Sequence, residues 1–291
     1  MNTTIPRTLI HCILISACIF QIQRLSAAPI QADFDDGNTT SAVDAYTGMA
    51  GDGWAAPWQD LTGNGLTSFT NTVEDTDPLN SGGNYLNVNL NYTGVGGTGQ
   101  GTISREFSTS SINTAAPIQY QFDFRMDIAL TDTTQRYFIF NRVGGAASGT
   151  DLNNTWAIQA RYNDASSTTW WIINGNGSGG VTEAINTEVS ADQGTAYTFM
   201  VHSDPENKAW NVNISDGTNN YTSDALGYRA NSTNDGAFLH FGALATPDGS
   251  SLGFSVDNIQ VALIPEPAQA TILLGLSALL ILGLNRRRAS D

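Results

Sequence analysis

Cysteine is nearly absent from this chain of 291 residues, and Lys208 is its only lysine. The two cysteines, Cys12 and Cys18, both lie in the apolar N-terminal stretch described below, so the segment after it contains no thiol. In that segment disulfide bonds, thiolate catalysis and a cysteine-ligated zinc ion are therefore excluded.

The sequence also lacks two short motifs that mark common hydrolases. It has no His-Glu-x-x-His motif, and no Glu-x-Asp-x-x-Glu strand that would place two carboxylates together for glycoside cleavage. His202 and His240 are the only histidines after the N-terminal stretch. We therefore predict a noncatalytic protein, and the alternative is aspartate-based chemistry assembled by folding.

Positive charge is scarce as well. The chain has 12 Lys and Arg residues against 27 Asp and Glu residues, and residues 29–264 hold 7 of the former and 25 of the latter, which gives that segment a formal charge of −18. A nucleic acid requires a basic surface, so it is excluded as a partner. An acidic surface rich in Asn, Thr, Ser and Gly is typical of an extracellular protein that repels polyanions and attracts divalent cations.

The first 28 residues have the layout of a secretory signal. A cation at Arg7 precedes an apolar run, and small residues stand just before Pro29. We expect a signal peptide over residues 1–28 with cleavage after Ala28. His11 and Arg24 fit this layout poorly, and a retained N-terminal anchor is the alternative.

The last 27 residues combine three elements in a fixed order. An uncharged, mostly aliphatic run over 268–284 is at the short end of the length that spans a bilayer. The motif before it is Pro265, Glu266 and Pro267, and the basic tail after it is Arg286, Arg287 and Arg288. Because arginines beside a membrane span stay cytoplasmic, we predict a transmembrane helix at 268–284 with the preceding residues outside the inner membrane.

This tail, residues 265–291, resembles the PEP-CTERM sorting signal. The resemblance implies an exosortase-type protease as partner, which would recognise the Pro-Glu-Pro motif and release the anchor. The implied location is first the inner membrane, with the domain in the periplasm, and finally the cell surface or the extracellular matrix. The two prolines keep the motif extended and remove backbone donors, which leaves it accessible to a protease.

Residues 29–264 carry apolar side chains at alternate positions. The longest such run is Ile118–Ile128, and Gly-, Asn- and Asp-rich breaks separate it from its neighbours. Shorter runs are Leu86/Val88/Leu90/Tyr92, Trp156/Ile158/Ala160/Tyr162, Tyr197/Phe199/Val201 and Trp210/Val212/Ile214. We predict an all-β domain over 29–264, a two-sheet antiparallel β-sandwich with jelly-roll connectivity.

The stretch from Tyr197 to Val261 resembles the later strands of concanavalin A-like (laminin-G-like) or carbohydrate-binding-module sandwiches. The segments that carry the resemblance are TFMVHSDPENKAWNVNISDGT and GFSVDNIQV. It implies a lectin-type fold, often with a sugar-binding face and a structural calcium ion, and it identifies no binding residue.

Asp33, Asp35 and Asp257 are the candidate metal ligands. In many jelly-roll modules the first and last strands lie together, and a carboxylate from each can share a calcium ion that backbone carbonyls and water complete. The apolar positions change phase between Val256 and Ile259, which predicts a bulge at Asp257 that would aim its carboxylate. The alternative is that these are turn and strand-edge carboxylates.

Four tryptophans, Trp54, Trp58, Trp170 and Trp171, are the candidate ligand-binding residues, because a flat ring stacks on the apolar face of a sugar. Trp170 and Trp171 are adjacent, so in a regular strand one of them leaves the core. Trp54 and Trp58 lie in a loop-like stretch and would form a cap or a platform. For any one of them, burial is the alternative.

The sequence as a whole predicts an exported, exosortase-sorted surface or matrix protein with a noncatalytic lectin-like domain. Extracellular polysaccharide is its candidate ligand. The alternative function is a polysaccharide-degrading enzyme, a glycoside hydrolase or lyase on a jelly-roll fold.

Overall fold

The computed structural model describes residues 28–36, 42–62, 66–94, 99–144, 153–163, 167–246 and 249–264. The predicted signal peptide, apart from Ala28, and the sorting tail with Pro265, Glu266, Pro267 and the three arginines lie outside these residues. The two terminal helices therefore stay predictions. Within the described residues, no helix has the length and apolarity that a bilayer span requires.

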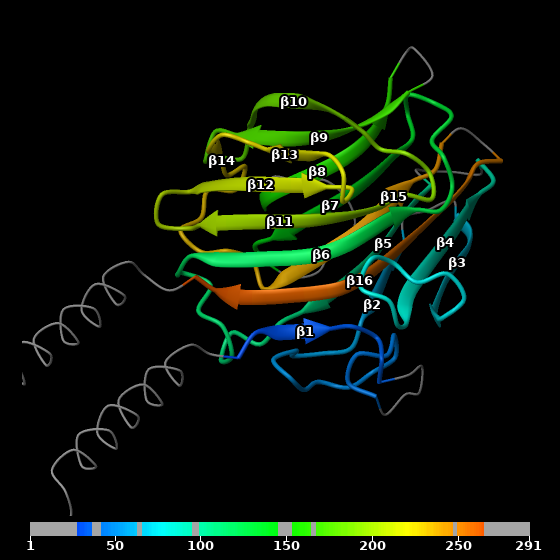
Figure 1. The fold of residues 1–291 in the computed structure, drawn as a ribbon. Helices are drawn as coiled ribbons and strands as arrows, with labels where there is room; N and C mark the ends of the chain where they lie inside the picture. Colours follow the sequence, from blue (N-terminus) through cyan, green and yellow to red (C-terminus); the bar gives the residue numbers. More distant parts are fainter. Residues whose placement is uncertain are drawn as a thin grey trace, which may run out of the picture. The chain divides into compact units, whose positions relative to one another are not determined.

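The described chain consists of β-strands joined by turns (Figure 1). The strands are β1 (Ile30–Ala32), β2 (Gln59–Thr62), β3 (Leu66–Glu74), β4 (Tyr85–Tyr92), β5 (Gln100–Glu106), β6 (Ile118–Met126), β7 (Arg136–Arg142), β8 (Asn154–Tyr162), β9 (Thr168–Gly175), β10 (Val181–Ser190), β11 (Ala196–Asp204), β12 (Ala209–Ser215), β13 (Asn220–Thr222), β14 (Leu226–Gly227), β15 (Phe238–Leu244) and β16 (Ser251–Leu263).

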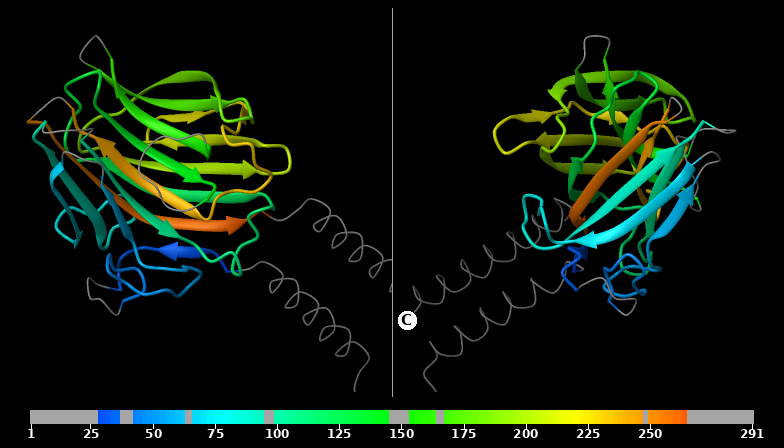
Figure 2. Two further views of the ribbon diagram at one scale, coloured as in Figure 1. Left: turned by 180° about the vertical axis from the view of Figure 1, so that it is seen from behind. Right: turned by 90° about the vertical axis from the view of Figure 1, so that its right-hand side faces the viewer.

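The strands form two antiparallel sheets (Figure 2). The nine-stranded sheet has the order β13-β12-β11-β6-β16-β4-β3, with β1 paired to β16 and β14 paired to β12. The seven-stranded sheet has the order β10-β9-β8-β7-β15-β5-β2. The chain changes sheet repeatedly, so neighbours within a sheet are often far apart in sequence.

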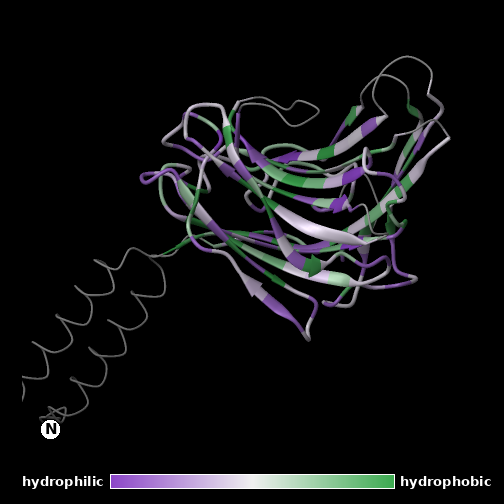
Figure 3. Ribbon diagram, turned by 90° about the horizontal axis from the view of Figure 1, so that it is seen from above, coloured by the Kyte–Doolittle hydropathy of each residue, from purple (hydrophilic) through white to green (hydrophobic). Residues whose placement is uncertain are grey.

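Alternation of apolar and polar residues explains which segments become strands, and the alternating colours along the strands of Figure 3 display it. In β6, Ile118, Tyr120 and Phe122 are fully buried, whereas Gln119 and Gln121 are half-buried. The four shorter predicted runs are β4, β8, β11 and β12. The prediction of these strands is confirmed.

The two sheets pack face to face through aromatic side chains. Phe122 of β6 meets Phe241 of β15 edge to face at 5.2 Å between ring centroids. Trp170 of β9 meets Phe199 of β11 in the same way at 4.8 Å. The predicted all-β, two-sheet antiparallel sandwich is therefore confirmed, while the jelly-roll connectivity stays a prediction.

A buried carboxylate crosslinks the sandwich. Asp235 accepts hydrogen bonds from the hydroxyls of Tyr120 at 2.8 Å, Ser203 at 2.8 Å and Tyr228 at 2.6 Å. Next to it, the amide of Asn141 in the seven-stranded sheet accepts from the Gly236 N–H at 2.7 Å and donates to the Gly236 carbonyl at 2.8 Å. Tyr120 and Ser203 belong to the nine-stranded sheet, so this network joins the two sheets.

Candidate functional site

The first and last strands lie together, as the calcium hypothesis requires. Strand β1 pairs with β16 antiparallel, with Ala32 opposite Ile259. In β16, Asp257 lies opposite Asp123 of β6 but Gln260 lies opposite Gln121, so one extra residue is inserted. Asn258 at the bulge has φ of 50°, a left-handed conformation that Asn tolerates better than most residues. The predicted bulge is confirmed.

Asp35, Asp123 and Asp257 interact electrostatically at this bulge. Burial raises the pKa of Asp257 to about 7, and the negative charges of Asp123 and Asp35 act in the same direction. Each carboxylate already accepts hydrogen bonds: Asp257 from Ser81 and from the Asn258 N–H, Asp35 from the Asn84 N–H at 2.8 Å, and Asp123 from Thr198 at 2.5 Å. Asp123 was missed by sequence reasoning, since only strand register places it opposite Asp257.

Asp33 belongs to a different cluster. The chain turns at Phe34, whose φ is 58°, and the Asp33 side chain hydrogen-bonds with that of Asp44. Burial raises the pKa of Asp44 to about 7, helped by this hydrogen bond and by the charges of Asp36 and Asp33. Among the described residues, no three His, Cys, Asp or Glu side chains are arranged to hold a metal ion. Calcium therefore stays a prediction without a complete set of side-chain ligands.

Trp54 and Trp58 form a buried cap, with only 2% and 5% of their surfaces exposed. The guanidinium of the buried Arg105 lies over both rings, 4.5 Å from the Trp54 centroid and 5.6 Å from that of Trp58. Arg105 Nε also donates to the Ala56 carbonyl at 3.1 Å. An exposed stacking platform does not fit these two residues, because the cationic side chain and the core enclose their rings.

Trp170 and Trp171 point to opposite faces of β9, as their adjacency predicts. Trp170 is fully buried between the sheets, so it also has no ring face available to a ligand. Trp171 lies on the other face and is half-buried. The Arg161 guanidinium lies 4.9 Å from the Trp171 ring centroid, and Trp171 Nε1 donates to Thr169 at 3.0 Å.

Trp171 belongs to the outer face, which we define as the side of the seven-stranded sheet that faces away from the nine-stranded sheet. A second hydrophobic cluster, separate from the core, lies on it and consists of Phe138, Phe140, Ala157 and Ile173. The Phe138 ring lies against Gly242, where a Cβ atom would approach it to 2.5 Å. Sequence reasoning missed this cluster, although the unbroken apolar run from Tyr137 to Phe140 signals a strand that is apolar on both faces.

Register places two neighbouring rows of side chains across the outer face. One row consists of Gln100, Leu244, Arg136, Arg161 and Thr169. The next consists of Leu61, Thr102, Gly242, Phe138, Gln159, Trp171 and Asn186. Neither row contains an acidic residue, in a chain that has 27 of them. The two rows therefore form a neutral to basic region of an acidic protein, in which Arg136, Arg161 and Trp171 are half-buried and Thr102, Phe138 and Gln159 are buried.

Arg136 and Arg161 lie directly opposite each other on β7 and β8. Burial lowers the pKa of both guanidinium groups, and the charge of Arg136 lowers that of Arg161 further. Arg161 Nε donates to Gln159 at 2.8 Å. In the described part of the chain Arg125 forms ion pairs, whereas neither Arg136 nor Arg161 does.

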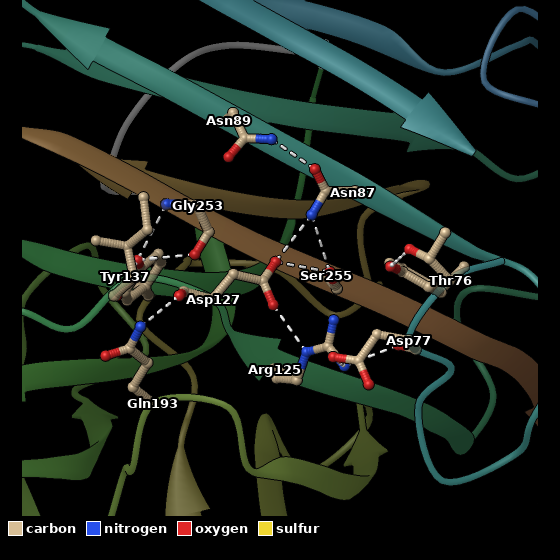
Figure 4. A network of polar contacts seen from close by, with 12 residues as sticks. Thr76, Asp77, Asn87, Asn89, Arg125, Asp127, Tyr137, Gln193, Gly253 and Ser255 are labelled. Carbon is tan, nitrogen blue, oxygen red and sulfur yellow. Dashed lines mark hydrogen bonds and ion pairs between the residues drawn. The ribbon is translucent and has the colours of Figure 1, made fainter. Parts of the chain in front are cut away.

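The nine-stranded sheet carries a polar network that is internally satisfied (Figure 4). Arg125 forms ion pairs with Asp127 at 2.7 Å and with Asp77 at 2.8 Å. The other carboxylate oxygen of Asp127 accepts from Asn87 at 2.9 Å and from Ser255 at 2.7 Å. Because its charges are paired, we interpret this network as a structural link between β4, β6 and β16.

The two histidines of the domain lie on opposite sides of the sandwich. His202 of β11 contacts Gln119 of β6 in the nine-stranded sheet at 3.2 Å. His240 of β15 lies on the outer face, where it is fully buried and stacks on Phe140 at 4.5 Å. They therefore do not act together in one site.

No family model matches the chain, and no curated protein does. Solved structures with a similar fold include a legume lectin-like domain from Entamoeba histolytica, at 9% identity and a TM-score of 0.47, with 72% of this chain and 90% of that one covered. A carbohydrate esterase from the Shiga toxin-encoding bacteriophage phi24B is 15% identical, with a TM-score of 0.45 and the same coverage of 72% and 90%.

An alginate lyase from Pseudomonas aeruginosa is 11% identical, with a TM-score of 0.42 and 61% of this chain and 82% of that one covered. At these identities and TM-scores none of the three similarities indicates what this chain does.

Proposed function

We propose that the chain is an exported surface or extracellular-matrix protein whose sandwich domain binds polysaccharide without cleaving it. The observation that carries the proposal is the outer face around Trp171, where a half-buried indole ring stands among amide and guanidinium groups. Sugar sites typically combine an aromatic ring, which contacts the apolar face of a pyranose, with planar polar groups that hydrogen-bond its hydroxyls.

Three features of this region support a sugar ligand. Trp171 is fixed by its hydrogen bond to Thr169 and by Arg161 above its ring, so little side-chain entropy is lost on binding. Asn186 lies opposite Trp171 on β10 and provides an exposed amide, whereas the amide of Gln159 on β8 is buried and holds Arg161 in place. The residues come from regular strands, which hold a site more rigidly than loops.

The export half of the proposal rests on the sequence. The signal-like segment at 1–28 and the tail at 265–291 are the features that lead us to propose sorting by an exosortase-type protease. The final location would then be the cell surface or the extracellular matrix, where polysaccharides are abundant.

The alternative is a polysaccharide-degrading enzyme. On the outer face, the described side chains suited to acid–base chemistry include the buried His240 and, opposite Phe238, Glu106. Release of reducing sugar that is abolished by His240→Gln, with the fold retained, would favour the enzyme.

Retention of the full-length chain on a panel of immobilised polysaccharides tests the proposal. We expect retention on at least one polymer, and at least tenfold weaker binding by Trp171→Ala. Trp54→Phe is the matched control, because it changes a tryptophan in the buried cap and leaves the outer face intact. Retention on no polymer, or equal retention of Trp171→Ala, would contradict the proposal.

A further inference from the structure

The outer face places two positive charges in an unfavourable arrangement. Arg136 and Arg161 are direct cross-strand neighbours, and like charges in that relation destabilise a sheet. Both side chains are half-buried, so water screens their repulsion less than at a fully exposed site. Within the described residues no carboxylate forms an ion pair with either one.

The chain offers many carboxylates that could neutralise this pair. Acidic residues outnumber basic ones by 27 to 12, so carboxylates for ion pairing are plentiful. Arg125 shows that a guanidinium group of this chain can be paired, since it pairs with both Asp77 and Asp127. By contrast, the row that contains Arg136 and Arg161 and the row next to it contain no acidic residue.

We propose that Arg136 and Arg161 bind the anionic groups of an acidic polysaccharide, with Trp171 contacting a sugar ring beside them. The inference rests on the proposed function and adds the class of polymer. A guanidinium group binds a carboxylate or a sulfate through two parallel hydrogen bonds, and two such groups side by side match a repeating negative charge. The ligand anion would supply the countercharge that the chain itself does not provide.

The acidity of the rest of the surface adds selectivity. A formal charge of −18 over residues 29–264 repels polyanions in general, whereas Arg136 and Arg161 attract an anionic polymer at this region. The sequence-based expectation that the surface avoids polyanions would therefore hold for most of the protein and fail on the outer face.

The test compares charged polymers with uncharged polymers of the same backbone. The full-length chain, solubilised in a nonionic detergent, is titrated with polygalacturonate and its methyl ester, and with dextran sulfate and dextran. We expect at least tenfold tighter binding to a charged polymer, carboxylated or sulfated, than to its uncharged form, and weaker binding at high salt. The preferred pair identifies which anionic group is recognised.

The matched variants are Arg136→Gln with Arg161→Gln, and Lys208→Gln as the control. The arginine double variant should lose at least tenfold in affinity for the charged polymer, whereas the Lys208 variant should stay within twofold. The double variant loses the repulsion but also the contacts of Arg161 with Trp171 and Gln159, so thermal melting is measured to establish that this variant folds. Should it unfold, the corresponding Arg→Lys double variant keeps the charges and should keep measurable binding with the same salt dependence.

Two outcomes would refute the inference, and one of them would also refute the proposed function. Equal binding of charged and uncharged polymers, unchanged in the arginine variants, would refute the anionic ligand and leave polysaccharide binding intact. No binding of any of these polymers or of the wider polysaccharide panel would refute both.

Discussion

The hydroxyl of Tyr228 donates a hydrogen bond of 2.6 Å to Asp235, a carboxylate that is only 3% exposed. Two further hydroxyls, from Tyr120 and Ser203, donate to the same carboxylate. Three hydroxyl groups therefore donate hydrogen bonds to one carboxylate inside the sandwich, and all three lose this acceptor if the carboxylate is removed.

Replacing Asp235 should therefore be costly. Asp235→Ala leaves the hydroxyls of Tyr120, Ser203 and Tyr228 without their acceptor, and we expect a loss of roughly 3–5 kcal/mol in the free energy of unfolding. Asp235→Asn keeps one acceptor oxygen and should cost less. Urea denaturation measures both, and a loss below about 1 kcal/mol in the alanine variant would show that the network contributes little.

The stability of the domain should decrease as the pH rises from about 4 to about 7.5. Burial raises the pKa of Asp235 to about 6 and that of Asp257 to about 7, above the ordinary aspartate value of 3.8. A carboxyl group whose pKa is raised by folding stabilises the folded state while it is protonated, and this contribution is lost as the pH rises through the folded-state pKa. One pKa unit corresponds to about 1.4 kcal/mol, so the combined loss from these two groups is on the order of 7 kcal/mol.

Denaturation midpoints across that pH range provide the measurement, with Asp257→Asn as the matched variant. The variant should show a shallower pH dependence than the wild type. Stability that increases steadily with pH over this range would contradict the assigned direction of both pKa shifts.

The bulge in β16 depends on a left-handed residue. Asn258 has φ of 50°, which a β-branched side chain adopts only with strain. We expect Asn258→Val to lose about 1–3 kcal/mol of stability and Asn258→Gly to lose less, since glycine adopts this conformation freely. Equal thermal stability of the two variants would mean that backbone strain at the bulge is unimportant.

The sequence predicts features that depend on neighbouring residues better than it predicts features that depend on which strands pair. The strand from Ile118, the bulge at Asp257 and the opposite directions of Trp170 and Trp171 all follow from local alternation, and all three are confirmed. Alternation is a property of the backbone, so a single sequence displays it.

The candidate site was less predictable, because it depends on which strands become neighbours. Arg136 and Arg161 are 25 positions apart, and their pairing follows only from the register of β7 and β8. Asp33 and Asp35 are separated by a turn at Phe34, which alternation does not reveal. Trp54 and Trp58 lie outside the strands, as predicted, but their contact with the distant Arg105 could not be predicted from local sequence.

The sorting hypothesis predicts a change in the processing of the protein. Replacing Pro265, Glu266 and Pro267 together by alanine should leave the chain uncleaved and membrane-bound, whereas Ser290→Ala, beyond the arginines, should be processed normally. Fractionation and immunoblotting in a host with an exosortase measure this. Release of the triple variant to the surface at the normal rate would rule out recognition of this motif.

The calcium hypothesis predicts that a chelator lowers the melting temperature, because a cation bound only by the folded state stabilises it. Of the predicted calcium ligands Asp33, Asp35 and Asp257, the carboxylates of Asp35 and Asp257 interact electrostatically with each other. Asp35→Asn should abolish the effect of added calcium on melting. A melting temperature that is the same in excess chelator and in excess calcium would remove calcium from the account.

Hydrogen–deuterium exchange with and without a bound polysaccharide tests the central claim most directly, because it locates the binding surface. The account predicts slower exchange in the ends of β7, β8 and β9 that carry Arg136, Arg161 and Trp171, with β4, β6 and β16 unchanged. Protection confined to the nine-stranded sheet, or no protection under conditions where the polymer is bound, would contradict it.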